Sequence, residues 1–347
     1  MQCPGCSQET PPGEFCVHCG FDIAAPTVVA QDKAEPMNPI VVQDAATVEA
    51  VSLDPLAAEE LKFHSAVPYP IAVSCFGISD AGLSGKNNED SFNVDGVLFP
   101  KHNIDVRFLI VSDGMGGEQA GEILSKLAVY DIAAGLWFLM PSHEQHLDFD
   151  KLGFWRFANG QFSRFLCNKI ASANKRVLDY GKAKKLKPGH YGATLVVVVA
   201  ITDLDLGRTN IYGYSDGDAR CYLVRDGSIE QLTTDQTVMG KPTQFLGAHE
   251  HLGGTEFTRE IWMGEQGLSQ VSLTLCSDGF WNMLSPESIA ESWKENGDIE
   301  AVTRQQLSKA LSVEIPYGNT LGVEKVTTGD DNVTIANICI SSRKEQP

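Results

Sequence analysis

The 347 residues suffice for one large domain with a small module, or for two medium domains. The formal net charge of −18 argues against binding to nucleic acid or to anionic membranes, although a merely soluble acidic surface would account for it as well. No apolar run reaches the ~18 residues that span a bilayer, and the first residues lack the pattern of a signal peptide, so we expect a cytoplasmic protein.

Cysteines are concentrated at the beginning of the chain. Four of the nine form two Cys-x-x-Cys pairs, Cys3 with Cys6 and Cys16 with Cys19. Four thiolates at this spacing suit one structural Zn²⁺, and residues 1–23 are too few to bury a core without a metal. A redox dithiol is the alternative, but no thioredoxin-like βαβ pattern follows. We therefore expect residues 1–23 to form a zinc ribbon.

This segment resembles the short zinc ribbons at the ends of many bacterial proteins. It contains acidic residues and no Lys or Arg, so a phosphate backbone would be repelled and we expect a protein partner. Residues 24–68 are rich in Pro, Ala and Val and poor in aromatic residues, which is typical of a flexible linker. A short helix over 55–63 is the one element that we consider within it.

Residues 69–343 have the texture of a folded domain. The expected strands cover 71–79, 107–112, 194–202, 209–214, 219–225, 271–277 and 332–340. The expected helices cover 118–139, the 160s to 180, 286–295 and 302–312. A hairpin signal at Asp226-Gly227 suggests antiparallel pairing. The pattern indicates an α+β domain in which helices cover the faces of antiparallel sheets.

Acidic residues stand at the ends of apolar runs in four places. They are Asn88-Glu89-Asp90-Ser91, Ser112-Asp113-Gly114-Met115, Ser277-Asp278-Gly279 and Asp330-Asp331-Asn332. A single Asp-Gly pair is usually only a turn. Four such motifs at strand ends, however, can bring carboxylates together, and clusters of oxygen ligands suit Mg²⁺ or Mn²⁺.

These motifs belong to a longer series that resembles metal-dependent serine/threonine protein phosphatases of type 2C. The series runs through 80–92, Asp113-Gly114-Met115-Gly116-Gly117, Gly121-Glu122, Gly192-Ala193-Thr194-Leu195, Gly217-Asp218-Ala219-Arg220, Ser277-Asp278-Gly279-Phe280-Trp281 and Asp331-Asn332. The order is that of the family, and the resemblance covers roughly residues 72–341. It implies a sandwich of two antiparallel sheets flanked by helices, with a site for two metal ions at one edge.

The resemblance also implies roles for individual residues. Asp113 would bridge two Mg²⁺ or Mn²⁺ ions, and Asp278 and Asp331 would complete the protein ligands of one ion. Glu89 would bind the other ion, with the Gly114 carbonyl contributing and Asp90 close by. The ions would neutralise the phosphate and activate water for attack on phosphoserine and phosphothreonine in protein substrates.

Some positions depart from the family. Gly85 stands where an arginine usually grips the substrate phosphate, so we expect the adjacent Lys86 to take over this contact. Residues 182–190 lack the aspartate that many members use for a third metal, and Gln236 stands where a histidine is frequent. A catalytically weak module that binds phosphoproteins or scaffolds a complex is therefore the alternative function.

Two other phosphoryl-transfer chemistries are excluded by the residues. No cysteine has an arginine six positions later, and no Gly-x4-Gly-Lys-Ser/Thr loop occurs. Near the site, we expect Asp218 and Arg220 to form a structural ion pair at a strand edge, since such pairs are commoner than catalytic ones.

Overall fold

The structure is a computed structural model that describes residues 59–64, 71–84, 86–116, 120–139, 151–263, 268–295, 298–312, 314–318, 324–328 and 331–342. Contacts divide the chain into two units, Met1–Ala57 and Ala58–Pro347, and every described residue belongs to the second. The zinc ribbon expected at 1–23 and most of the linker expected at 24–68 lie outside the described residues.

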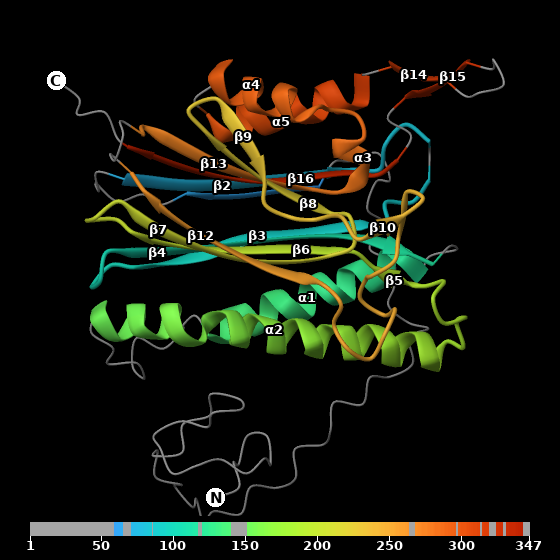
Figure 1. The fold of residues 1–347 in the computed structure, drawn as a ribbon, viewed down its shortest axis with the longest axis horizontal. Helices are drawn as coiled ribbons and strands as arrows, with labels where there is room; N and C mark the ends of the chain where they lie inside the picture. Colours follow the sequence, from blue (N-terminus) through green and yellow to red (C-terminus); the bar gives the residue numbers. More distant parts are fainter. Residues whose placement is uncertain are drawn as a thin grey trace, which may run out of the picture. The chain divides into compact units, whose positions relative to one another are not determined.

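Two antiparallel sheets stack on each other at the centre of the second unit (Figure 1). The first sheet contains, in spatial order, β1 (Glu59–His64), β2 (Ile71–Asp80), β16 (Val333–Ser342), β13 (Gln270–Cys276), β8 (Arg220–Arg225) and β9 (Ser228–Gln231). The second contains β12 (Thr255–Trp262), β7 (Arg208–Asp216), β6 (Leu195–Asp203), β4 (Ile104–Met115) and β3 (Asp90–Phe99), with β5 (Gly192–Ala193) paired to the end of β4. Two small hairpins are added, β10 (Thr237–Val238) with β11 (Lys241–Pro242) and β14 (Glu314–Gly318) with β15 (Glu324–Thr328).

Helices cover the outer faces of both sheets (Figure 1). α1 (Ala120–Leu139) and α2 (Lys151–Ala183) lie on the second sheet, and α3 (Asp278–Trp281), α4 (Pro286–Glu295) and α5 (Ile299–Ser312) lie on the first. The expected α+β sandwich of antiparallel sheets flanked by helices is therefore confirmed. Among the helices of the described ranges, none is both long enough and apolar enough to cross a membrane.

The apolar residues form one core between the sheets and one under each helical layer. Strand β6 shows why the sequence produces this arrangement. All nine of its residues are buried, because one face meets the first sheet and the other meets the helices. A continuous run of Val, Leu, Ala and Ile is the sequence that such a doubly covered strand requires.

One expectation within the linker is wrong. The helix considered over 55–63 is absent, because Glu59–His64 forms β1 and pairs antiparallel with β2 along its whole length. The backbone hydrogen bonds offered by the edge of β2 outweigh the helix propensity of Glu, Leu and Lys in this segment. The folded domain therefore begins before residue 69.

Candidate active site at the acidic edge of the sandwich

The four acidic motifs meet at one edge of the sandwich. Asp113 lies near the end of β4 and Asp90 opens its neighbour β3. Asp278 follows the end of β13, and Asp331 precedes the start of the neighbouring β16. Antiparallel neighbours place the end of one strand beside the beginning of the next, so all four carboxylates come to the end where α3 and β5 lie in Figure 1.

Asp90 is the most deeply buried of these acids. It is directly opposite Asp113 in the β3–β4 register, and it is 4% exposed. Neither of its carboxylate oxygens has a hydrogen-bond partner with good geometry. Burial raises the pKa of Asp90 to about 8, with Asp278 and Asp331 adding to the rise and the nearby hydroxyls of Ser277 and Thr334 opposing it.

The pKa values of Asp113 and Asp278 are both raised by neighbouring carboxylates. Burial raises the pKa of Asp113 well above its ordinary value, and the charges of Asp90, Asp278, Asp331 and Asp218 raise it further. Burial also raises the pKa of Asp278 to about 7, followed by the charges of Asp331 and Asp218. Carboxylates that disfavour each other in this way are stabilised by a cation placed among them.

The carboxylates do not form a closed cage. In the part of the chain that the structure describes, no group of three or more His, Cys, Asp or Glu side chains is spaced to hold a metal ion by itself. A cation here would need other oxygen ligands as well. The orphaned oxygens of Asp90 and the mutual repulsion of the acids are what a hard cation with retained water would relieve.

A backbone oxygen is available next to Glu89. A Cβ atom built on Gly121, at the start of α1, would lie 2.6 Å from the Gly114 carbonyl oxygen and 2.7 Å from Glu89 Oε1, so these two oxygens lie against the same glycine. Gly114 itself has no room for a side chain, because a Cβ there would lie 2.0 Å from the Gly121 carbonyl oxygen. Glu89 Oε1 and the Gly114 carbonyl oxygen therefore lie near each other, and their shared role as metal ligands stays a prediction.

The loop that carries Glu89 is anchored by Asn332. The Asn332 amide group donates to the carbonyls of Ala81 and Asn87, at 3.0 and 3.2 Å, and its oxygen accepts from the Glu89 backbone N–H at 2.8 Å. The Glu89 carbonyl in turn accepts from Ser125 Oγ at 2.6 Å. The family motif had marked Asn332 without a role, and the structure gives it this positioning role.

Lys86 is exposed on this loop. Burial raises the pKa of Glu89, Asp331 and Glu122 add to the rise, and the Lys86 ammonium group lowers it. Lys86 is therefore near the acidic edge. Its contact with a substrate phosphate stays a prediction, and Gly85 lies outside the described residues.

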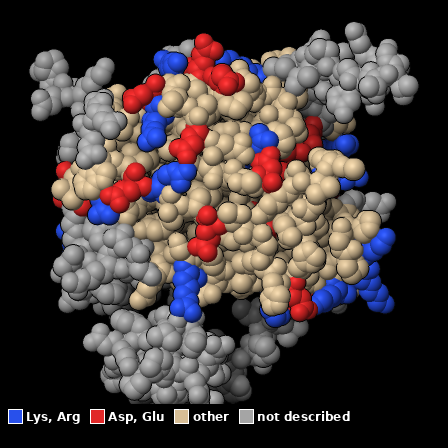
Figure 2. Space-filling model, in the orientation of Figure 1, with Lys and Arg blue, Asp and Glu red and all other residues tan. Residues whose placement is uncertain are grey.

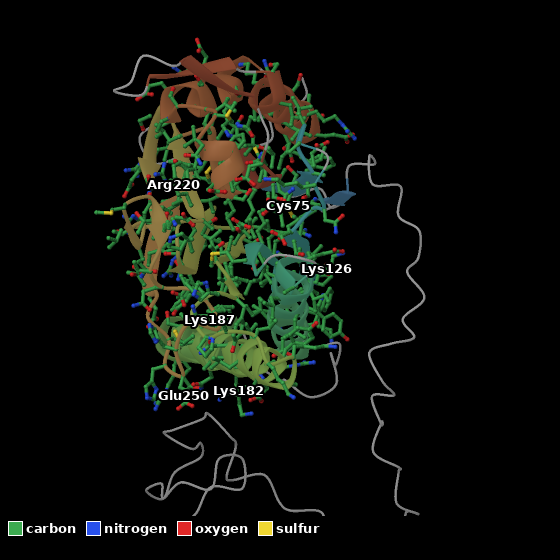
Figure 3. The ribbon with its side chains drawn as sticks, turned by 90° about the vertical axis from the view of Figure 1, so that its right-hand side faces the viewer. Cys75, Lys126, Lys182, Lys187, Arg220 and Glu250 are labelled. Carbon is green, nitrogen blue, oxygen red and sulfur yellow. The ribbon has the colours of Figure 1, made fainter. Side chains whose placement is uncertain are left out.

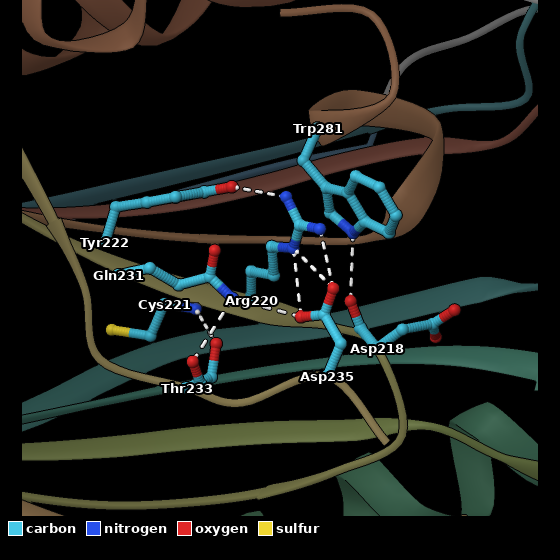
Figure 4. A network of polar contacts seen from close by, with 8 residues as sticks. All are labelled: Asp218, Arg220, Cys221, Tyr222, Gln231, Thr233, Asp235 and Trp281. Carbon is cyan, nitrogen blue, oxygen red and sulfur yellow. Dashed lines mark hydrogen bonds and ion pairs between the residues drawn. The ribbon is translucent and has the colours of Figure 1, made fainter. Parts of the chain in front are cut away.

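The expectation that Asp218 and Arg220 form an ion pair is wrong. Arg220 pairs instead with Asp235, through Nη2 to Oδ2 at 2.6 Å and Nε to Oδ1 at 3.0 Å (Figure 4). Its guanidinium group also donates to the Tyr222 hydroxyl and stacks 3.5 Å from the centre of the Trp281 ring. The Trp281 indole N–H donates to the Asp218 carbonyl at 2.9 Å.

Asp218 is the site residue that sequence reasoning missed. Its side chain is 5% exposed, and its charge raises the pKa of both Asp113 and Asp278. The signal that could have found it is positional, because it follows the apolar strand β7 as Asp278 follows β13. Gln236 holds the same turn, since its side-chain oxygen accepts from the Gly217 N–H at 2.9 Å and its own N–H donates to the Gly217 carbonyl.

Comparisons with known proteins identify the family of this domain. The family model described as protein phosphatase 2C matches residues 83–312. The serine/threonine phosphatase stp of Listeria welshimeri is 25% identical over an alignment of 280 residues that covers 74% of this chain and 92% of that protein. The serine/threonine protein phosphatase PstP of Mycobacterium tuberculosis is 28% identical over an alignment of 305 residues that covers 77% of this chain and 52% of PstP.

Solved structures show the same fold. A crystal structure of the M. tuberculosis phosphatase PstP aligns with a TM-score of 0.54 and 24% identity, over 78% of this chain and 99% of that one. The catalytic domain of PstP in complex with 2 manganese ions gives a TM-score of 0.55 at 24% identity, with the same coverage. The family match spans most of the second unit and includes Glu89, Asp113 and Asp278. The chain therefore belongs to the protein phosphatase 2C family and is a serine/threonine protein phosphatase of that type.

Proposed function

We propose that the chain hydrolyses phosphoserine and phosphothreonine in proteins with water activated by two Mg²⁺ or Mn²⁺ ions at the acidic edge. The observation that carries this proposal is the buried Asp90 carboxylate. It has no well-formed hydrogen bond, and it lies opposite Asp113 among carboxylates that raise one another's pKa. Such an arrangement is costly for a metal-free protein and favourable for one that binds cations.

The described residues fit a two-ion site with water completing the ligand shells. Asp113 would bridge the ions. Asp278 and Asp331 would hold one of them, and Glu89 and the Gly114 carbonyl would hold the other. Asp90 would orient water beside the second ion. Mg²⁺ usually keeps several waters, so a closed cage of protein ligands is not required.

When bound, the ions supply positive charge to the phosphate and lower the pKa of water. The protein's own contribution is to leave these acids without a direct ion pair among the described residues. Arg220 is engaged by Asp235, and Asn332 holds the Glu89 loop by neutral hydrogen bonds. PstP, whose catalytic domain has been solved with 2 manganese ions, supports the choice of metal.

The test is Mn²⁺-dependent hydrolysis of p-nitrophenyl phosphate and of a phosphothreonine peptide, together with metal binding measured by calorimetry. Asp278→Asn should abolish turnover and weaken metal binding. Asp226→Asn is the matched control, because Asp226 is exposed in the β8–β9 hairpin with φ 49°, which asparagine also adopts. Full turnover in the presence of a chelator, or unchanged metal binding in Asp278→Asn, would contradict the proposal.

The second candidate function is a weak phosphatase-like module that binds phosphoproteins. The specific observation that favours it is the cation beside Glu89, which is a lysine rather than a bidentate arginine. If Lys86 holds the phosphate, Lys86→Ala should raise KM for the phosphopeptide and Gly85→Arg should lower it. Phosphopeptide binding without Mn²⁺-dependent turnover would favour the binding module.

We also propose that residues 1–23 form a ribbon around one Zn²⁺, which binds a protein partner. The support is the spacing of Cys3, Cys6, Cys16 and Cys19. Metal analysis of the full chain under reducing conditions should find one zinc, and the Cys3→Ser/Cys6→Ser variant should lose it. The control is Cys167→Ser, which changes a free cysteine of α2. Zinc that persists in the double variant would contradict the ribbon.

A further inference from the structure

Four lysines follow one another closely where α2 ends, and we call them the basic turn. They are Lys182, Lys184, Lys185 and Lys187, and all four are exposed. No Asp or Glu occurs between Asp179 and Asp203, in a chain whose net charge is −18. Figure 2 shows Lys and Arg side chains at the lower right of the molecule, where α2 ends in Figure 1.

The backbone of the basic turn is fixed. The Leu186 N–H donates to the Gly181 carbonyl at 2.9 Å and the Lys185 N–H donates to the Lys182 carbonyl at 3.1 Å, which is the hydrogen-bond pattern of a Schellman cap. Leu186 packs against the core beneath. Lys185 has φ 56°, at the position of the cap where glycine is usual, so this lysine stands in a backbone conformation that disfavours a side chain.

Two of the four lysines, Lys182 and Lys184, contact other described side chains of the domain. Lys182 Nζ lies 3.7 Å from a Glu250 carboxylate oxygen, and both side chains are well exposed. The Lys184 ammonium group lies 5.8 Å from the centre of the Tyr180 ring. Among the described residues, Lys185 and Lys187 have no ion pair. Lysines near the end of a helix also stabilise its dipole, but Lys187 lies beyond the last turn.

The basic turn is joined rigidly to the acidic edge. The His190 N–H donates to the Lys187 carbonyl and closes a turn there. The next residue, Tyr191, is buried with its ring against Gly181. Tyr191 Cβ also lies 3.5 Å from the position that a Cβ on Gly116 would take. β5 then begins at Gly192 and pairs with Gly114 and Met115. Figure 3 looks onto this side of the domain and labels Lys182, Lys187 and Arg220.

From this juxtaposition we propose that the basic turn binds acidic residues next to the phosphorylated residue of a protein substrate. The proposal rests on the proposed function and names its substrate class. A phosphorylated segment with Asp or Glu beside the phosphate is repelled by a protein of net charge −18. Exposed lysines beside the site offset this repulsion locally, and Lys185 and Lys187 are the two without a partner in the described domain.

The test compares two double variants of the full chain. Lys185→Asn/Lys187→Gln removes the two lysines, and asparagine keeps the left-handed backbone at position 185. Lys101→Gln/Lys294→Gln is the matched control, because both lysines are exposed and lie elsewhere on the domain. Each protein is assayed with Mn²⁺ on p-nitrophenyl phosphate and on two phosphothreonine peptides, one flanked by Glu and one flanked by Lys.

We expect the basic-turn variant to raise KM for the Glu-flanked peptide about three- to tenfold, with kcat unchanged, and to lose this difference at high salt. KM for the Lys-flanked peptide should stay the same or fall, and turnover of p-nitrophenyl phosphate should not change. An unchanged KM for the Glu-flanked peptide, or an equal rise in the control variant, would overturn the proposal.

Binding of both peptides, labelled with fluorescein, separates this proposal from the proposed function. If the wild type does not hydrolyse p-nitrophenyl phosphate, the proposed function fails, while weaker binding of the Glu-flanked peptide to the basic-turn variant still supports the docking surface. A labelled single-stranded oligonucleotide serves as the other probe. If the basic-turn variant loses only oligonucleotide binding, the assignment to acidic protein segments is wrong.

Discussion

Asp278 should make the metal-free protein lose stability as the pH rises. Burial and the charges of Asp331 and Asp218 raise its pKa to about 7 in the folded chain, against an ordinary value of 3.8. A carboxyl group with a raised folded pKa holds its proton more tightly in the folded state than in the unfolded state. Its contribution to stability is therefore fully present below pH 3.8 and is lost as the pH rises through about 7.

The size of this loss follows from the two pKa values. Between about pH 5 and pH 8, the ionisation of a group that titrates near 7 when folded and near 3.8 when unfolded lowers the free energy of unfolding by about 2–3 kcal/mol. For a domain of this size, that loss corresponds to roughly 5–10 °C in Tm. Asp90, Asp113 and Asp216 also have raised pKa values, so the loss in the wild type should exceed that of Asp278 alone.

Thermal and urea denaturation in chelator, from acidic to mildly basic pH, measure this loss directly. Asp278→Asn should reduce the fall in stability by about 2–3 kcal/mol, because asparagine does not titrate. Asp226→Asn should behave as the wild type. Excess Mn²⁺ should raise stability most at the basic end, where the carboxylates are ionised. A metal-free wild type whose stability is flat or rises over this range would refute the reasoning.

Three further predictions concern single residues. Asp113→Asn should lower kcat by several orders of magnitude and abolish the rise of Tm with Mn²⁺, and a variant that keeps most of its Mn²⁺-dependent activity would rule out a bridging role. Gly114→Ala should cost on the order of 1–3 kcal/mol in urea denaturation, because its Cβ would lie 2.0 Å from a backbone oxygen; unchanged stability would contradict that close approach. Asp105→Asn should destabilise the domain by about 3–5 kcal/mol, because it removes a carboxylate that pairs with the fully buried Arg107, and a cost below about 1 kcal/mol would show that the other contacts of Arg107 compensate for the loss.

Long apolar or strongly periodic segments made most of the fold predictable. The run expected at 194–202 is β6, and the helix expected at 286–295 is α4 with the same bounds. β12 was missed because it lies at the edge of its sheet and most of its residues are exposed. β3 was missed because Asp95 and Gly96, which are rare inside strands, interrupt its apolar residues.

The acids of the site were predictable from position, but their neighbours were not. Asp90, Asp113, Asp278 and Asp331 stand at strand ends, and antiparallel pairing is enough to bring them to one edge. The partner of Arg220 depends on how two loops meet. Asp235 lies 15 residues further along the chain, and it is brought to the guanidinium group by the segment that also places Gln236 on Gly217. No local pattern encodes that meeting.

These neighbours explain how the domain can keep a cluster of unpaired acids. The Glu89 loop is held by the amide of Asn332, and the Asp218 turn is held by Gln236 and by the indole of Trp281. All three are neutral groups that bind the backbone and leave the carboxylates free. Arg220, the cation next to the turn, has its charge matched by Asp235. The carboxylates are therefore left available to a cation from solution, and the same residues that would hold the metal also limit the stability of the metal-free fold.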